Sequence, residues 1–327
     1  MLHRQTVKFA LILGLALAAS PAPVSPERMP EQTGPWRWET DKERNLALIG
    51  PAGEIWRFRC DPGLDHAYFH SLSTVEGRVL TADRPPDHIW HHGLWFSWKY
   101  IDKVNYWEVD AASGRPAGRT TWTIAAMETR ADRTARLVLD LDYRPAGADR
   151  PVLIERRTIE VSAPGLDGVY FLDWTAEYQA AKDLVLDRTP LLGEPGGQIN
   201  GGYAGLALRL AGGLEDLRLV TDQGPAGEFT NDRYRGRHTG LDYAGQMEGE
   251  PAGIAILDHP QNPRAPTAWY AVHSAVMAFF NPALLSPGPL TLRNGERMTL
   301  RYRILIHPGR WDAARLKAEA LRFANVR

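Results

Sequence analysis

Apolar and polar residues alternate with a period of two along several long segments of this chain. Residues 170–178 show the pattern most clearly: one face carries Tyr170, Leu172, Trp174, Ala176 and Tyr178, and the other carries Asp173, Thr175 and Glu177. The same alternation runs through residues 137–143 and 298–306, and shorter apolar runs cover 152–161, 206–210 and 253–257. Successive side chains of a strand point to opposite faces of a sheet, so this period indicates half-buried antiparallel strands.

One segment near the end of the chain has helical spacing instead. Asp312 can cap a helix, and Leu316, Ala320 and Phe323 then fall on one face of it. No glycine-rich phosphate loop precedes a helix in the sequence, and strands do not alternate with helices, which argues against Rossmann, P-loop and TIM-barrel folds. We therefore predict an all-β fold, a large antiparallel β-sandwich with a short C-terminal helix.

The composition of the chain restricts the partners it can bind and the metal sites it can form. The chain has 327 residues, of which 44% are hydrophobic, so it can bury a large core. Its 38 Lys and Arg residues nearly balance 39 Asp and Glu residues, and no basic tract favours nucleic acid as a partner. The single cysteine, Cys60, excludes an intrachain disulfide and a multi-cysteine zinc site. No pattern in the sequence indicates an oligomeric state.

The N-terminus has the features of an export signal. His3, Arg4 and Lys8 give a basic start, the apolar run 9–19 is short for a membrane span, and small residues follow it. We expect a signal peptide over residues 1–22, a linker over 23–35 and a single β-sandwich domain over 36–327. An uncleaved membrane anchor is the alternative. If the signal peptide is cleaved, the mature chain has no membrane span and is exported, either to the periplasm or to the medium.

The stretch from Arg84 to Trp98 concentrates titratable and aromatic side chains: Asp87, His88, Trp90, His91, His92, Trp95 and Trp98. If residues 88–98 form a strand, His92 faces one way and His91 the other, unless Gly93 permits a bulge or bend. Pro85 and Pro86 stiffen the preceding loop, so we expect Asp87 and His88 to lie on its rim.

Two chemical roles fit this cluster. Imidazoles exchange protons near neutral pH, so His91 and His92 are our first candidates for acid–base work, with His88 and Asp87 orienting or assisting them. In the second role, His88, His92 and a remote carboxylate would hold a metal ion. The spacing lacks a helical HExxH motif, so our prediction includes no metal and no cofactor. The tryptophans Trp90, Trp95 and Trp98 are candidate platforms for a sugar ring, although the same pattern also fits hydrogen-bonded histidines and core tryptophans.

Two further segments are candidate parts of the site. A short apolar strand ends at Asp258 and His259, and a proline-stiffened loop follows with Asn262 and Arg264. This segment could meet the first cluster at one mouth of the sandwich, or it could simply shape a turn. The glycine-rich loop 196–205 is typical of a pocket wall, in which Gln198, Asn200 and Tyr203 could bind hydroxyl groups.

The segment Asp87–Trp98 resembles the Asp-His-Pro-His-His-(Arg)-Gly-Leu-Trp-Phe signature of bacterial proteins labelled "methane oxygenase PmoA-like", a family of unknown function. The resemblance continues in residues 105–107, 201–206, 258–264 and 301–309. Ile89 and Trp90 depart from the proline and spacer that are more usual, and no Arg stands between His92 and Gly93. If that Arg binds an anion in relatives, this chain lacks an arginine to bind the anion at the same position.

The resemblance implies a fold similar to the galactose-mutarotase supersandwich, whose enzymes use a histidine acid and a carboxylate base. It does not imply methane oxidation, because membrane-bound monooxygenase subunits need apolar runs of 18 or more residues, which this chain lacks. We therefore predict an exported protein that acts on a carbohydrate or sugar-derived small molecule by epimerisation, elimination or hydrolysis. The alternatives are a non-catalytic carbohydrate-binding protein and a metal-dependent hydrolase.

Overall fold

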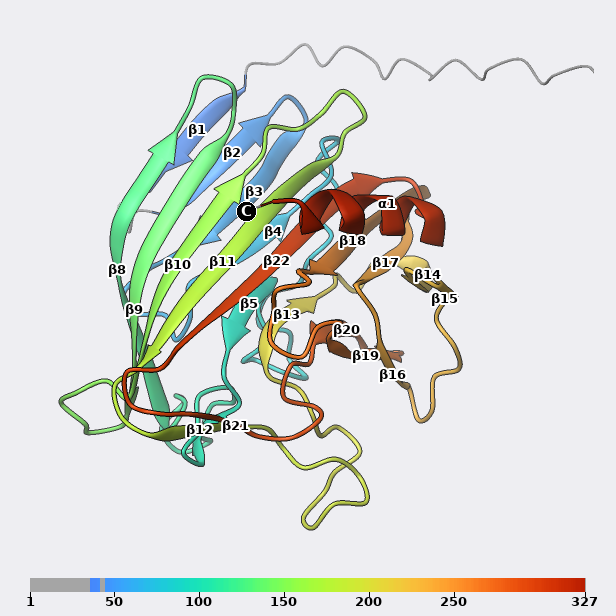
Figure 1. The fold of residues 1–327 in the computed structure, drawn as a ribbon. Coiled ribbons are helices and arrows are strands. Elements are labelled where there is room, and N and C mark those ends of the chain that lie inside the picture. Colours follow the sequence, from blue (N-terminus) through green and yellow to red (C-terminus); the bar gives the residue numbers. More distant parts are fainter. Residues whose placement is uncertain (1–35, 42–44, 327) are drawn as a thin grey trace, which may run out of the picture. The chain divides into compact units, whose positions relative to one another are not determined.

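Two nine-stranded sheets, in which every pair of strands is antiparallel, form the body of the protein (Figure 1). The computed structural model describes residues 36–41 and 45–326. The first sheet contains, in spatial order, β1 (Arg37–Thr40), β2 (Leu46–Gly50), β3 (Gly53–Arg59), β4 (Tyr68–Leu72), β5 (Leu94–Ser97), β13 (Gly205–Arg209), β20 (Met277–Pro282), β19 (Ala268–Ser274) and β16 (Arg233–Arg237). The second contains β15 (Gly224–Pro225), β14 (Glu215–Thr221), β17 (Gly240–Met247), β18 (Glu250–Asp258), β22 (Arg297–Pro308), β11 (Tyr170–Ala180), β10 (Leu153–Val161), β9 (Ala135–Pro145) and β8 (Gly118–Thr129).

A small third sheet consists of β21 (Leu290–Leu292), β12 (Leu184–Asp187), β6 (Tyr100–Ile101) and β7 (Val104–Asn105). The strands that alternate in sequence are the long central strands β9, β11 and β22 of the second sheet, and their apolar faces are buried. Trp174 of β11, for example, lies opposite Tyr302 of β22 in the core between the large sheets. The predicted antiparallel β-sandwich is therefore confirmed.

The predicted C-terminal helix is also present, as α1 (Ala313–Ala324). The side chain of Asp312 accepts a hydrogen bond from the backbone N–H of Arg315 at 2.8 Å, which satisfies one of the donors left free at a helix start. Leu316 and Phe323 pack on Ala255, Leu257 and Leu305 of the second sheet. This helix therefore covers part of the outer face of that sheet, where Figure 1 shows it beside β18 and β17.

The outer face of the first sheet carries a second apolar cluster. Along β5, Leu94 and Phe96 point into the core between the sheets, whereas Trp95 points outward. The same parity sends Ala207 of β13, Phe279 of β20, and Tyr270 and Val272 of β19 to the outer face. These side chains are buried because loops cover them, and they form the floor on which the candidate site stands.

The expected strand over residues 88–98 is much shorter in the structure, where only Leu94–Ser97 pair in the sheet. The preceding residues turn back on themselves, since the N–H of His91 bonds the carbonyl of His88 and the N–H of Arg84 bonds that of His91. Gly93 marks the junction, because a Cβ atom there would lie 2.3 Å from the carbonyl oxygen of Phe69. The three histidines therefore project from a loop and not from one strand.

The expected signal peptide (1–22) and linker (23–35) lie outside the described residues. Within residues 36–41 and 45–326, no helix has the length and apolar character needed to cross a membrane.

Candidate functional site

A cavity of about 130 Å³ opens over the outer face of the first sheet. Strands β16, β19 and β20 and three covering loops contribute its walls. Its lining residues are His88, Trp90, His91, Trp107, Glu108, Asn200, Tyr203, Arg233, Tyr270, Val272, Met277 and Phe279. The cavity is thus mostly aromatic and apolar, with a few polar groups converging in it, as is typical of small-molecule sites.

His88 is oriented by a chain of charged groups behind it. Its Nδ1 donates to Asp87 at 2.8 Å, and Asp87 accepts in turn from the buried guanidinium of Arg209 at 2.9 and 3.0 Å. Burial raises the pKa of Asp87, but the hydrogen bonds from His88 and Arg209 outweigh it and hold this pKa below its usual value. An ionised Asp87 fixes the tautomer of His88 in which Nε2 can accept a proton.

His91 lies under His88 as a neutral, buried imidazole. Its ring stacks on His88 at 4.6 Å between ring centres and on Phe279 at 5.1 Å, and its Nδ1 has no hydrogen-bond partner. Burial lowers the pKa of His91 well below its usual value, and the charge of the nearby Arg209 acts in the same direction. A cavity-lining histidine that is neutral and unpaired is suited to accept a proton or a hydrogen bond.

His92 turns away from the cavity, although it follows His91 directly. Its Nδ1 bonds Asp83 at 2.8 Å, and its ring stacks on Tyr68 at 4.1 Å between centres. Tyr68 also donates to Asp83, so the three side chains form a closed network. His92 is not among the lining residues, and its place in the structure is that of a support behind the site.

Glu108 is the carboxylate of the cavity, and sequence reasoning missed it. Its oxygens accept hydrogen bonds from Lys99, from Asn105 at 2.7 Å and from the hydroxyl of Tyr203. The ring centre of Tyr203 lies 5.1 Å from that of Trp107 and 6.3 Å from that of Tyr270. Burial and then the charge of Glu108 raise the pKa of Tyr203, so its hydroxyl stays protonated and donates to the carboxylate.

The predicted aromatic platforms divide between three places. Trp90 lines the cavity, and Trp95 lies fully buried beneath it at 5.1 Å from the ring of His91. Trp98 points into the core between the sheets, where it packs against Tyr178, and this removes it from the cavity. The glycine-rich loop supplies Asn200 and Tyr203 to the wall. Four further lining residues were not predicted as site residues: strand pairing brings Arg233, Tyr270 and Phe279 to the motif, and the loop after β7 brings Trp107.

The structure does not bring the Asp258–Arg264 segment to the cavity. Asp258 accepts from Asn262 and from the backbone of Thr267, and burial raises the pKa of Asp258 to about 6. His259 packs edge-on to Phe323 of α1 and reaches the carbonyl of Val326. Arg264 donates to the carbonyls of Leu284, Gly288 and Pro289. These contacts hold a loop and the C-terminal helix, and the segment follows β18 of the other large sheet.

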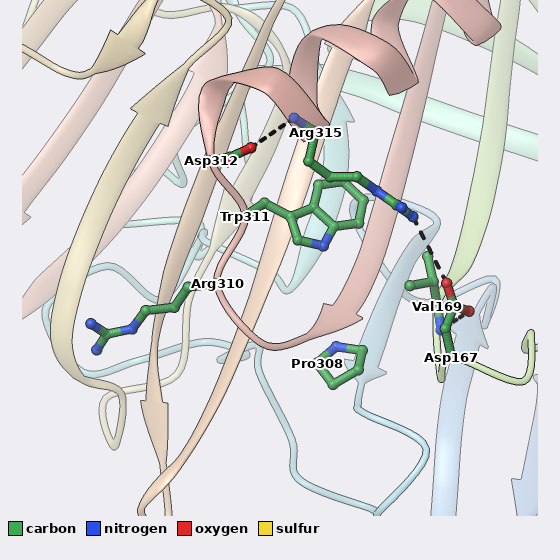
Figure 2. Close-up of a pocket in the computed structure, with 7 residues that line it drawn as sticks. All are labelled: Asp167, Val169, Pro308, Arg310, Trp311, Asp312 and Arg315. Atoms are coloured by element: carbon green, nitrogen blue, oxygen red, sulfur yellow. Dashed lines mark hydrogen bonds and ion pairs between the residues drawn. The ribbon is translucent and has the colours of Figure 1, made fainter. Parts of the chain in front are cut away.

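A second, larger hollow of about 350 Å³ lies beside the start of α1 (Figure 2). Its polar side chains already have partners: Asp312 caps the helix, Arg310 binds Asp216, and Arg315 binds Asp167 and Glu319. Trp311 is stacked on His307 at 4.0 Å between ring centres. We therefore place the candidate site in the smaller cavity, where buried polar atoms are unpaired.

A metal centre has no ligand set among residues 36–41 and 45–326, since no group of three or more His, Cys, Asp or Glu side chains there could hold an ion. His88 and His92, the two histidines of the alternative metal-binding role, instead bond different aspartates, Asp87 and Asp83.

Fold and cavity together define a large antiparallel β-sandwich with an aromatic, histidine-containing pocket on the outer face of one sheet. A family model described as "Family of unknown function (DUF6807)" matches residues 54–321, and the chain belongs to this family. The match covers both the histidine motif and the strands that carry the rest of the pocket. The family found is thus DUF6807, whereas the motif resemblance pointed to the PmoA-like proteins.

Solved structures that resemble this chain include a GH36 α-galactosidase from Geobacillus stearothermophilus (9% identity, TM-score 0.42, covering 82% of this chain and 40% of that one). Others are an α-galactosidase from Lactobacillus brevis (10%, 0.36, 83% and 37%) and a putative aldose 1-epimerase from Klebsiella pneumoniae subsp. pneumoniae (8%, 0.41, 86% and 84%). The chain spans about 40% of the length of the two α-galactosidases. No curated protein matches its sequence significantly.

Proposed function

We propose that the cavity binds a saccharide, or a small molecule derived from one, and carries out proton transfer on it. The observation that carries this proposal is the meeting of an unpaired, neutral His91 with aromatic walls and a carboxylate in one cavity. Flat aromatic faces such as Trp90 and Tyr203 pack against the C–H face of a sugar ring, while nearby polar groups select its hydroxyls.

In this proposal His91 and His88 exchange protons with the bound molecule. His91 is available to accept a proton because burial lowers its pKa and so keeps its ring neutral. His88 accepts or returns a proton at Nε2, and Asp87 and Arg209 keep its ring in position. Glu108 and Tyr203 act from the same cavity as hydrogen-bond partners for the sugar. Such an arrangement fits epimerisation, elimination or hydrolysis.

One observation favours a second candidate, a non-catalytic saccharide-binding protein. Glu108 is held by Lys99, Asn105 and Tyr203 at once, as expected for a carboxylate that shapes a binding wall and takes no proton. In that case the aromatic rings bind the ligand, and the histidines serve only as hydrogen-bond partners.

Incubation with a panel of neutral and acidic mono- and oligosaccharides, followed by NMR of the mixture, tests the proposal. We expect at least one saccharide to change in anomeric or C–H signals, or to yield a new product, as the enzyme concentration rises. Binding without any chemical change would identify the non-catalytic alternative. A panel in which nothing binds and nothing changes would overturn both.

We also propose that the chain is exported, with residues 1–22 removed and 36–327 acting as one domain after a linker. The basic and apolar composition of residues 3–19 supports this proposal. We further propose that the chain is related to the PmoA-like proteins, which the Asp87–Trp98 motif supports. Mass spectrometry of the mature protein is expected to show loss of the first ~22 residues, and an intact N-terminus in the exported fraction would contradict it.

A further inference from the structure

A positive charge lines the cavity without a carboxylate to balance it. Arg233 of the edge strand β16 is a lining residue, and it forms no ion pair with any residue in 36–41 or 45–326. Its Nη1 donates to the carbonyl of Asn231 at 2.6 Å, but its buried Nε has no hydrogen-bond partner. The Nε is itself buried, but the guanidinium forms part of the cavity wall beside Tyr270, so a ligand that supplies an anionic acceptor to it would be stabilised.

The groups around Arg233 add to this positive character. Arg235, two residues along the same strand, lies over the ring of Tyr270 at 4.5 Å and donates to the carbonyl of Gly201 at 2.6 Å. Burial lowers the pKa of Arg235, and repulsion from Arg233 contributes to the shift. Glu108, the carboxylate of the lining, is already bonded to Lys99, so it leaves the charge of Arg233 uncompensated.

We infer that the molecule bound in this cavity carries an anionic group, a carboxylate or a sulfate ester, which binds Arg233. Arg233 lines the cavity and pairs with no carboxylate of the described residues, so an anionic oxygen in the cavity would accept a charge-assisted hydrogen bond from its guanidinium. The inference rests on the proposed function and narrows it to acidic saccharides, such as sugars with a carboxylate on the ring.

Isothermal titration calorimetry of the whole protein tests the inference with three sets of sugars. The probes are glucuronic and galacturonic acids, glucose 6-sulfate, and neutral glucose and galactose. We expect an acidic sugar to bind roughly ten- to hundredfold more tightly than its neutral counterpart, because charge-assisted hydrogen bonds contribute that much. The preference should shrink as ionic strength rises from about 0.05 M to about 0.5 M, since salt screens charge attraction.

Arg233→Gln is expected to abolish the preference for the acidic sugar, and Arg233→Lys, which keeps the charge but not the planar guanidinium, is expected to keep part of it. Arg37→Gln is the matched control, because Arg37 is an exposed arginine on β1, at the opposite edge of the same sheet, where it pairs with Glu39 at 2.7 Å. It should leave every affinity unchanged. If a variant fails to fold, the affinities of the natural protein for acidic and neutral sugars still show whether the cavity prefers an anionic ligand.

Tighter binding of the uronic acids supports the carboxylate form, and tighter binding of the sulfated sugar alone supports the sulfate form. Equal binding of acidic and neutral sugars, unchanged in Arg233→Gln, would overturn the inference and leave the proposed function standing. Absence of binding by every sugar, neutral or acidic, would overturn both.

Discussion

Arg157→Met is expected to lower the free energy of unfolding by about 3–5 kcal/mol, because it leaves a buried carboxylate without its cationic partner. Glu155 and Arg157 are fully buried on the inward face of β10, and Arg157 donates to Glu155 at 2.6 and 3.0 Å. The hydroxyl of Tyr143 also donates to Glu155, and the guanidinium lies 4.7 Å from the ring centre of Trp174. Removing the cation leaves the carboxyl group of Glu155 between the sheets with only the Tyr143 hydroxyl as a partner among the described residues.

Arg156→Met is the matched control for this change. Arg156 is the next residue of the same strand, but it faces solvent and pairs with Asp140 at 2.9 Å, with half of its side chain exposed. Exposed ion pairs contribute about 0–1 kcal/mol, so this variant should unfold close to the natural protein. Urea denaturation followed by fluorescence measures both. Equal destabilisation by the two substitutions would show that the buried pair has no special role.

His91→Asn is expected to reduce kcat on the preferred saccharide by about 10²–10⁴-fold, the usual contribution of a positioned acid or base. Asparagine keeps a polar group near the position of Nδ1 but cannot accept a proton at neutral pH. The pKa of His91 is lowered, so the ring is neutral throughout the neutral range and becomes protonated only in more acidic solution. The acidic limb of the kcat/KM profile of the natural protein should therefore lie below pH 6.5.

His273→Asn serves as the control, since His273 is an exposed histidine on β19, packed beside Phe229 and Tyr243 and outside the lining of the cavity. Its turnover should match that of the natural protein. If both variants keep full activity and the same pH profile, His91 has no part in the chemistry.

Period-two alternation was enough to predict the sandwich, because burial on one face imposes it on long strands such as β11 and β22. It gives no guidance at residues 88–93, whose sequence His-Ile-Trp-His-His-Gly does not alternate, and there main-chain turns run up to Gly93. The same parity that places Leu94 and Phe96 in the core also carries Trp98 there. Alternation predicts which residues share a face but not where a strand begins.

The candidate site could be predicted only where its residues are close in sequence. His88, Trp90 and His91 were found through their density, and Tyr203 through its glycine-rich loop. Arg233 and Phe279 reach the cavity through the pairing of β5 with β13, β13 with β20, β20 with β19 and β19 with β16, and no local pattern encodes that order. Closeness in sequence can also mislead: His92 directly follows His91, but its side chain bonds Asp83 and does not line the cavity.

A crystal structure of the protein soaked with the saccharide that binds most tightly tests the central claim most directly. We expect a sugar ring against Trp90 and Tyr203, with a sugar oxygen within hydrogen-bond distance of His91 or His88. A sugar bound only beside α1 against Trp311, with this cavity empty, would contradict it.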